Sequence, residues 1–243
     1  MTRIGTLLSL ADPVLAEAAG DSLDLAWIDL EQGAVTVRDA QALTLALQSR
    51  SCSALVRLAH GHSEALPALL ASGIDGVVSP RCEAPEEAEA LVARLRFPPR
   101  GTRAVARGRA GSFGRLGSRQ RSRAATVECM VEIGSAAGVG AADAIAGVDG
   151  VDALVVGCAD LTLQLGTPAP GSPALHDALR RVADAARRAG VAFGVAVDEP
   201  LLEHLDLMPD IVVCSVDVCL YAAAMDGLAE RLRSRGESTG ARA

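Results

Sequence analysis

Eight short apolar runs, separated by stretches with helical spacing, constrain the fold of this chain most. The runs are rich in residues that favour buried strands and lie at 4–8, 24–30, 53–58, 75–79, 127–133, 152–157, 192–197 and 210–215. The stretches between them, including 36–48, 62–71, 84–96, 173–189 and 217–233, space apolar residues as amphipathic helices do. Buried strands that alternate with helices form parallel βα units, and eight such units match an α/β fold of the closed (β/α)8 TIM-barrel type.

The main alternative is an open, doubly wound sheet. In that fold the first strand is followed by the phosphate-binding turn G-x-G-x-x-G, which is missing here. GVGAAD at 138–143 resembles the turn weakly but falls inside a helical stretch. The chain has 243 residues, half of them hydrophobic, which is enough for one large core. We therefore predict one barrel domain over 1–234 and a flexible tail over 235–243.

One segment interrupts the alternation of strands and helices. Residues 98–123 contain eight arginines and no acid, and we expect an enlarged loop after the fourth strand, on the catalytic face of the barrel. Two interpretations stay open: a solvated basic segment, or a cover that attracts anionic substrates by charge.

Composition excludes several classes of function. A net charge of −7 and 2% aromatic residues argue against binding to nucleic acid or to an anionic membrane. No apolar run is long enough to span a bilayer, and the start of the chain does not read as a signal peptide. Six scattered cysteines predict buried free thiols of a cytoplasmic protein. All 23 basic residues are arginine, which excludes a Schiff-base lysine, pyridoxal phosphate (PLP) bound to lysine, and a Walker A loop.

Polar residues gather where the predicted strands end, which is where barrels carry out chemistry. Burying such groups is costly unless they are paired or bound to a cation, so their convergence predicts a site for an anion and a metal. Pairing of Arg57 with Glu132, and helix capping by Asp160, remain simpler alternatives for those residues; Asp217 is expected to be an N-cap. The residues concerned are Asp29, Glu31 and Gln32 after the second strand, Arg57 in the third, Glu132 in the fifth, Asp160 after the sixth and Asp217 after the eighth.

Several segments resemble the HpcH/HpaI aldolases, in order and to about residue 225: GTLLSLADP (5–13), WIDLEQG (27–33), LVRL (55–58), RFPPRGTRAV (96–105) and GVDALVVGCADLTLQLGTP (150–168). The resemblance implies a barrel that uses a divalent metal, Mg²⁺ or Mn²⁺, to make or cleave a carbon–carbon bond beside pyruvate or a related 2-oxoacid. The implied substrate is a small carboxylate. It also implies a homo-oligomer, a hexamer or a dimer, in which the last helix is exchanged between subunits.

The resemblance also implies roles for single residues. Arg57 matches the arginine that contacts the 2-oxoacid and stabilises enolate charge. Asp160 matches an aspartate ligand of the metal, with Ala159 beside it against the substrate. Asp29 and Glu31 match the acids around the family's catalytic histidine.

Two positions depart from the family's pattern. Gln32 stands where the catalytic histidine is expected, and an amide cannot act as a general base. Gly134 stands where a glutamate ligand of the metal is expected, and Glu132 replaces a glutamine. Glu132 either joins Asp160 as a substitute ligand of a weakly held metal, or fills the site with its own charge against Arg57.

The resemblance therefore predicts a divergent lyase. The alternatives are a barrel repurposed for decarboxylation, cyclisation or dehydration, and a barrel that only binds a ligand. Among the histidines, His60 and His62 follow the third strand and are the candidates for a substitute base, although exposed loop imidazoles are the simpler interpretation. His176 and His204 lie on helical segments and are weaker candidates.

Overall fold

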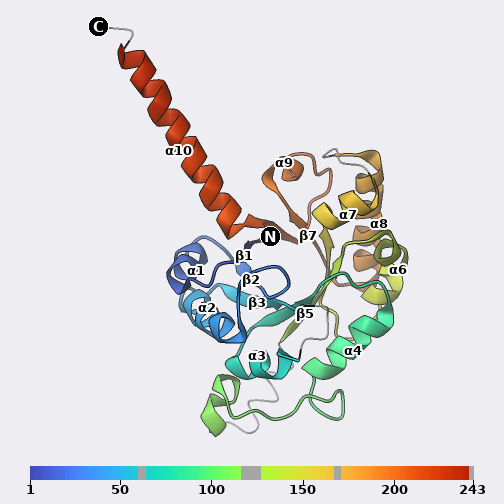
Figure 1. The fold of residues 1–243 in the computed structure, drawn as a ribbon. Helices are drawn as coiled ribbons and strands as arrows, with labels where there is room; N and C mark the ends of the chain where they lie inside the picture. The colour runs from blue at the N-terminus through green and yellow to red at the C-terminus, as the bar shows by residue number, and fades with distance from the viewer. Residues whose placement is uncertain (60–63, 116–126, 167–170, 241–243) are drawn as a thin grey trace.

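A computed structural model describes residues 1–59, 64–115, 127–166 and 171–240, and its centre is a closed barrel of eight parallel strands (Figure 1). Each strand pairs with the next along the chain, and β1 pairs with β8 to close the barrel. The predicted (β/α)8 fold is confirmed, and each predicted run overlaps one strand. The strands are β1 (Arg3–Leu8), β2 (Leu25–Asp29), β3 (Ser53–Arg57), β4 (Gly76–Ser79), β5 (Glu128–Ile133), β6 (Ala153–Gly157), β7 (Ala192–Val197) and β8 (Ile211–Val216).

Helices surround the barrel and follow most of the predicted stretches. Side-chain caps begin several of them: Thr36 and Asp39 form a reciprocal capping box at the start of α2, and Ser135 and Ser172 cap α6 and α8. The helices are α1 (Pro13–Gly20), α2 (Val37–Ser49), α3 (Leu66–Ser72), α4 (Pro85–Leu95), the 3₁₀ helix η1 (Arg109–Gly114), α6 (Ala136–Ala146), α7 (Cys158–Gln164), α8 (Pro173–Ala189), α9 (Glu199–Leu202) and α10 (Asp217–Gly240).

Two apolar cores form because strand side chains alternate between the inside and the outside of the barrel. The outer core packs the strands against the helices, and the inner core fills the barrel with Leu25, Trp27, Leu55, Met130 and Val155 among others. The alternation continues past the inner core. Asp29 follows Trp27 by two residues, Arg57 follows Leu55, and Glu132 follows Met130, so these charged groups lie over the barrel interior at the carboxyl ends of the strands.

The described part of the arginine-rich segment, 98–115, lies at the opposite end of the barrel from the predicted one, which is a correction. α4 starts soon after β4 and reverses the chain direction, so the residues after α4 lead into the amino end of β5. The Arg109 guanidinium donates to Gln48 Oε1 and to the Ser72 carbonyl, near the ends of α2 and α3. Arg96 donates to the carbonyl of Val127, just before β5. The described part of the segment, up to residue 115, therefore does not cover the catalytic face; residues 116–126 lie outside the described residues.

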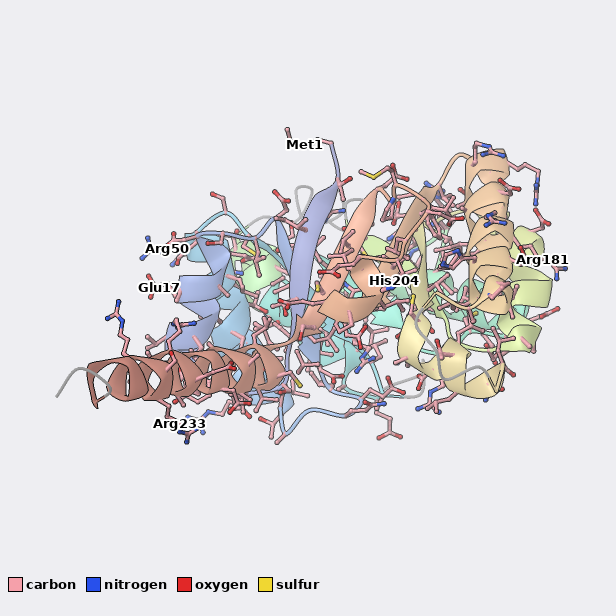
Figure 2. The ribbon with its side chains drawn as sticks, turned by 90° about the horizontal axis from the view of Figure 1, so that it is seen from above. Met1, Glu17, Arg50, Arg181, His204 and Arg233 are labelled. Atoms are coloured by element: carbon pink, nitrogen blue, oxygen red, sulfur yellow. The ribbon has the colours of Figure 1, made fainter. Side chains whose placement is uncertain are left out.

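The last helix, α10, projects away from the barrel in both views (Figures 1 and 2). Asp217 was expected to be the N-cap, but it is the first residue of the helix. Its carboxylate accepts hydrogen bonds from the backbone N–H groups of Ser9 and Leu10, after β1, and from that of Val218. No side chain from Val218 to Arg235 is buried within this single chain. The helix continues through residue 240, into the predicted tail, and residues 241–243 lie outside the described residues. The barrel boundary near residue 234 stays a prediction.

All six cysteines are free, and four of them are buried, as predicted: Cys52, Cys82, Cys129 and Cys158. Burial raises the pKa of the Cys82 thiol to about 12, so the buried thiol stays protonated and unreactive at neutral pH. Among the described residues, no helix combines the length and apolar character needed to cross a membrane.

Candidate active site

A buried arginine stands at the centre of the carboxyl face of the barrel. Arg57 ends β3 and pairs in register with Asp29 at the end of β2. Its Nε donates to Asp29 Oδ1 at 3.0 Å and its Nη2 to Asp29 Oδ2 at 2.8 Å, a two-pronged contact that fixes the guanidinium plane. The Arg57 side chain is only 8% exposed. Burial alone lowers its pKa, but the hydrogen bonds to Asp29 and the charges of Glu132, Asp29 and Glu31 together raise it above its usual value.

Asp29 also shapes the turn that follows its strand. Its Oδ1 accepts hydrogen bonds from the backbone N–H groups of Glu31 and Gln32, at 3.0 and 3.3 Å. The turn is tight: a Cβ at Gly33 would collide with the carbonyl oxygen of Asp29. Asp29 therefore holds Arg57 and the turn together, and it is not free to orient a side chain at position 32.

Glu31 lies between two guanidinium groups. Its Oε2 is 3.5 Å from Arg57 Nε, and its Oε1 is 3.3 Å from Nη2 of Arg81, two residues beyond β4. The side chain of Glu31 is buried, whereas that of Arg81 is 57% exposed. The carboxylate thus links the deep arginine to a second arginine at the open side of the site.

Glu132 lies deepest, on β5, with its Oε2 3.6 Å from Arg57 Nη1. That oxygen is buried and has no hydrogen-bond partner among the described residues. The neighbouring strand leaves room for the carboxyl group, because a Cβ at Gly157 would come within 2.5 Å of Glu132 Oε1. Burial raises the pKa of Glu132 to about 7; the Arg57 charge opposes the rise, and the charges of Glu31, Asp160 and Asp29 add to it.

Asp160 lies in the first turn of α7, beyond β6, with 37% of its side chain exposed. Its Oδ2 is 3.6 Å from Arg81 Nε. Gly134 faces this pair, since a Cβ there would lie 3.4 Å from Asp160 Cβ and 3.7 Å from Arg81 Cγ. Ala159 precedes Asp160 and is exposed. The structure therefore places positions 134 and 160 side by side, as the resemblance implies for two ligand positions.

Histidine is not found at this site within the described residues. Gln32 is exposed and its backbone N–H binds Asp29. His176 lies 3.4 Å from Asp206, and His204 contacts the carbonyl of Pro200. His60 and His62, the candidate substitute bases, lie outside the described residues.

The sequence predicts that Glu132 and Asp160 together hold a metal, and the metal role of this pair stays a prediction. In the described ranges, no group of three or more His, Cys, Asp or Glu side chains is placed to hold a metal ion. Glu132 faces Arg57, and Asp160 faces Arg81. Of the two arrangements foreseen for Glu132, the structure has the one in which it opposes Arg57. With a guanidinium facing each of the two carboxylates, the arrangement suits a divalent metal poorly, and the arginines supply the positive charge.

Arg81 was not predicted as a site residue. It lies just past the end of β4, so the rule that selected the other residues, polar groups at strand ends, also applies to it. The more conspicuous arginines of segment 98–123 suggested a basic cover instead. The contacts of Arg81 with Glu31 and Asp160 form because three loops meet in space, and the local sequence does not reveal that meeting.

Comparison with known proteins supports the family resemblance seen in the sequence. The profile of the HpcH/HpaI aldolase/citrate lyase family matches residues 3–205. A hydroxypyruvate/pyruvate aldolase of Deinococcus radiodurans is 34% identical over 242 residues, covering 96% of this chain and 86% of the relative. A 4-hydroxy-2-oxovalerate aldolase of Rhodococcus jostii is 32% identical over 235 residues, covering 95% and 91%.

Solved structures agree in fold. An HpcH/HpaI aldolase/citrate lyase family protein from Burkholderia cenocepacia superposes with a TM-score of 0.88 at 29% identity, covering 96% of this chain and 95% of that one. The barrel described above is thus shared over nearly the full length of both proteins.

Proposed function

Since the chain belongs to the HpcH/HpaI aldolase/citrate lyase family, we propose that it is a carbon–carbon lyase acting on a small 2-oxoacid. The observation that carries the proposal is Arg57, a buried guanidinium fixed by Asp29 over the barrel interior. A fixed positive charge in a site sheltered from water stabilises negative charge that develops on a substrate oxygen. Cleavage next to a 2-oxo group develops that charge.

In the proposed reaction, a 4-hydroxy-2-oxoacid loses the proton of its 4-hydroxyl group as the bond between C3 and C4 breaks. An aldehyde leaves, and the electron pair of the broken bond forms the enolate of the remaining 2-oxoacid. Arg57 stabilises the enolate oxygen, and C3 then takes up a proton to give the 2-oxoacid product. The hydroxyl proton passes to water, because Gln32 cannot accept it.

Replacement of the histidine by Gln32 favours one second reaction. Loss of CO₂ from a 3-carboxy-2-oxoacid such as oxaloacetate gives the same enolate and requires no base, because CO₂ rather than a proton leaves. Arg57 stabilises that enolate in the same way. Decarboxylation is therefore our second candidate.

Aldolases of this family are generally dependent on a divalent metal. We propose that Mg²⁺ or Mn²⁺ binding by this chain is weak or absent. Mg²⁺ is commonly held through one or two carboxylates and several waters, so Asp160 with Glu132 would be the minimal set. Glu132 would have to leave Arg57 to join Asp160, which leaves the guanidinium with less compensation in a buried site.

Exchange of the methyl protons of pyruvate in D₂O, followed by NMR, tests the proposed function. We expect exchange that is slow but measurable, because the site stabilises the enolate while water has to take the methyl proton. Release of aldehyde from 4-hydroxy-2-oxoacids should be slow for the same reason, since Gln32 stands in place of the histidine. Oxaloacetate tests the second candidate in the same assay. An absence of exchange, cleavage and decarboxylation alike would contradict both and indicate a barrel that only binds its ligand.

We propose that α10 packs against a second copy of this chain in a homo-oligomer. One side of the exposed helix carries apolar side chains at alternating spacings of three and four residues, the pattern of a helix that packs on a partner: Val218, Tyr221, Met225, Leu228 and Leu232. Such a stripe is costly to leave in water. The exchange of the last helix that the resemblance implies would cover it.

Replacement of Leu228 by Glu tests the oligomer. We expect the native protein to be a dimer or larger by light scattering, and Leu228→Glu to shift it toward the monomer because a charge would be buried in the stripe. Glu230→Gln, on the other side of α10, is the matched control and should leave the assembly unchanged. A native monomer would contradict the proposal.

We also propose a cytoplasmic location. Buried, unpaired thiols such as Cys129 and Cys158 are typical of proteins from reducing compartments. The proposed substrates, small anionic 2-oxoacids, are handled by the same proposed site and require neither a membrane nor a nucleic acid.

A further inference from the structure

Arg81 forms a positively charged bridge across the open side of the site. Its Nη2 is 3.3 Å from Glu31 Oε1, and its Nε is 3.6 Å from Asp160 Oδ2. The two acids come from different loops, after β2 and β6, and Arg81 comes from the loop after β4. The guanidinium thus lies between carboxylates that would otherwise repel each other.

The backbone holds Arg81 in an uncommon conformation that aims it there. Its φ is +47°, in the left-handed region that residues with a Cβ rarely adopt. The next residue is anchored, because the N–H of Cys82 donates to the carbonyl of Glu132 at 2.9 Å. Backbone strain of this kind persists where the surrounding structure imposes it and is concentrated at functional sites.

Gly134 leaves the space that the Arg81 side chain uses. A Cβ at this position would already be 3.7 Å from Arg81 Cγ and 3.4 Å from Asp160 Cβ. A longer side chain at 134 would enter the space between Arg81 and Asp160. The small residue at 134 and the guanidinium of Arg81 are therefore sterically compatible.

The charges at these two positions compare in a similar way. A divalent cation with one carboxylate ligand carries one net positive charge, and Arg81 with Gly134 carries one as well. Glu132, which stands in place of a neutral glutamine, carries one negative charge when it is ionised and faces Arg57. A guanidinium cannot accept electron pairs as a metal does, but it presents several N–H donors in a plane that matches a carboxylate.

We propose that the Arg81 guanidinium replaces the divalent cation in this site and, with Arg57, binds the carboxylate and enolate oxygens of the 2-oxoacid without metal. This inference rests on the proposed function for the identity of the ligand. Arg81 can perform this role because its side chain is 57% exposed, so an incoming carboxylate reaches it from solvent. Its existing contacts, at 3.3 and 3.6 Å, are longer than charge-assisted hydrogen bonds of 2.7–2.9 Å, so a substrate carboxylate can offer better ones.

Oxalate, a stable dianion with the oxygen arrangement of an enolised 2-oxoacid, is the probe. We expect the native protein to bind oxalate by calorimetry in the presence of EDTA, with an affinity that added Mg²⁺ or Mn²⁺ changes by less than about twofold. Arg81→Met keeps most of the side-chain volume and removes the charge. Loss of charge-assisted hydrogen bonds is expected to weaken oxalate binding about 10- to 100-fold. Arg81→Lys should recover part of the loss, because lysine keeps the charge but not the planar fork.

Arg100→Met is the matched control, since Arg100 is similarly exposed, pairs with Asp149, and lies in the segment at the other end of the barrel. It should leave oxalate binding unchanged, and the thermal unfolding midpoints of the two methionine variants should agree. Oxalate binding that requires Mg²⁺ and survives Arg81→Met would overturn the inference, as would no binding under either condition. Metal-free, Arg81-dependent binding without any pyruvate exchange or cleavage would uphold the inference and refute the proposed function, so the two failures are distinguishable.

Discussion

Replacement of Arg57 by methionine is expected to lower pyruvate proton exchange, and any cleavage or decarboxylation, by roughly 100- to 1,000-fold. That is the range for the loss of one fixed donor to a developing oxyanion. The effect should fall on kcat as well as on kcat/KM, because the guanidinium acts most strongly when the enolate has formed. Initial rates of the native and variant proteins over a range of pyruvate concentrations would measure it.

The same change is expected to destabilise the fold. Asp29, Glu31 and Glu132 would lose the cation between them, and removing one partner of a buried ion pair costs about 3–5 kcal/mol. The pKa of Glu132 should rise further, since Arg57 is the group that lowers it. Denaturant unfolding would measure the loss of stability.

Two further variants separate catalysis from folding. Arg57→Lys keeps a positive charge but loses the two-pronged contact with Asp29, so it should fold better than the methionine variant and remain well below native activity. Arg3→Met removes the partly exposed pair with Glu128 and should cost less than about 1 kcal/mol with unchanged activity. An Arg57→Met protein with native rates would show that the enolate is not formed at this arginine.

Restoring the family's residues at positions 32 and 134 is expected to produce the largest gain in the rate of aldol cleavage. Gln32→His supplies a base, and a general base contributes about 100- to 10,000-fold to the rate. Gly134→Glu supplies a carboxylate facing Asp160, where a Cβ fits. Together they should raise aldol cleavage of 4-hydroxy-2-oxoacids measurably, whereas Gly134→Glu alone should have little effect because it supplies no base.

The second arginine determines how large the gain becomes. With Arg81 in place, a glutamate at 134 is expected to pair with its guanidinium, which lies beside that position. Adding Arg81→Met to the double variant frees the carboxylates of Glu31 and Asp160, so the gain in the triple variant should depend on added Mg²⁺. Aldehyde release with and without EDTA would measure it. Rapid cleavage by the native protein would contradict the loss of the base, and an unchanged rate in the triple variant would favour a pocket reshaped for decarboxylation.

The barrel could be predicted because its signal is local and repeated. A run such as 152–157 is apolar throughout, which is typical of a strand covered on both faces, and β6 spans Ala153–Gly157. The rule that barrel chemistry gathers at the carboxyl ends of strands also predicted that Asp29, Arg57 and Glu132 would meet at one end of the barrel. Strand ends are readable from the sequence before the fold is known.

The ionic partners could not be predicted in the same way. The sequence left Glu132 with two possible roles. In the structure Glu132 Oε2 lies 3.6 Å from Arg57 Nη1, and the described residues place no group of three possible metal ligands together. The prediction placed the described part of the arginine-rich segment, 98–115, at the wrong end because its position depends on where α4 reverses the chain. The role of Arg81 depends on contacts across three loops.

The sequence by itself determined the strands and helices, the end of the barrel where polar groups gather, and the absence of the histidine and of one carboxylate from that end. Each of these follows from residue identity and spacing along the chain. Only the tertiary structure decided which charge faces which, how far the pKa of Glu132 rises, and that Arg81 lies between Glu31 and Asp160. Those properties depend on the distances between the charged groups and on their burial. Distances of a few ångströms arise only when the closed barrel brings distant loops together.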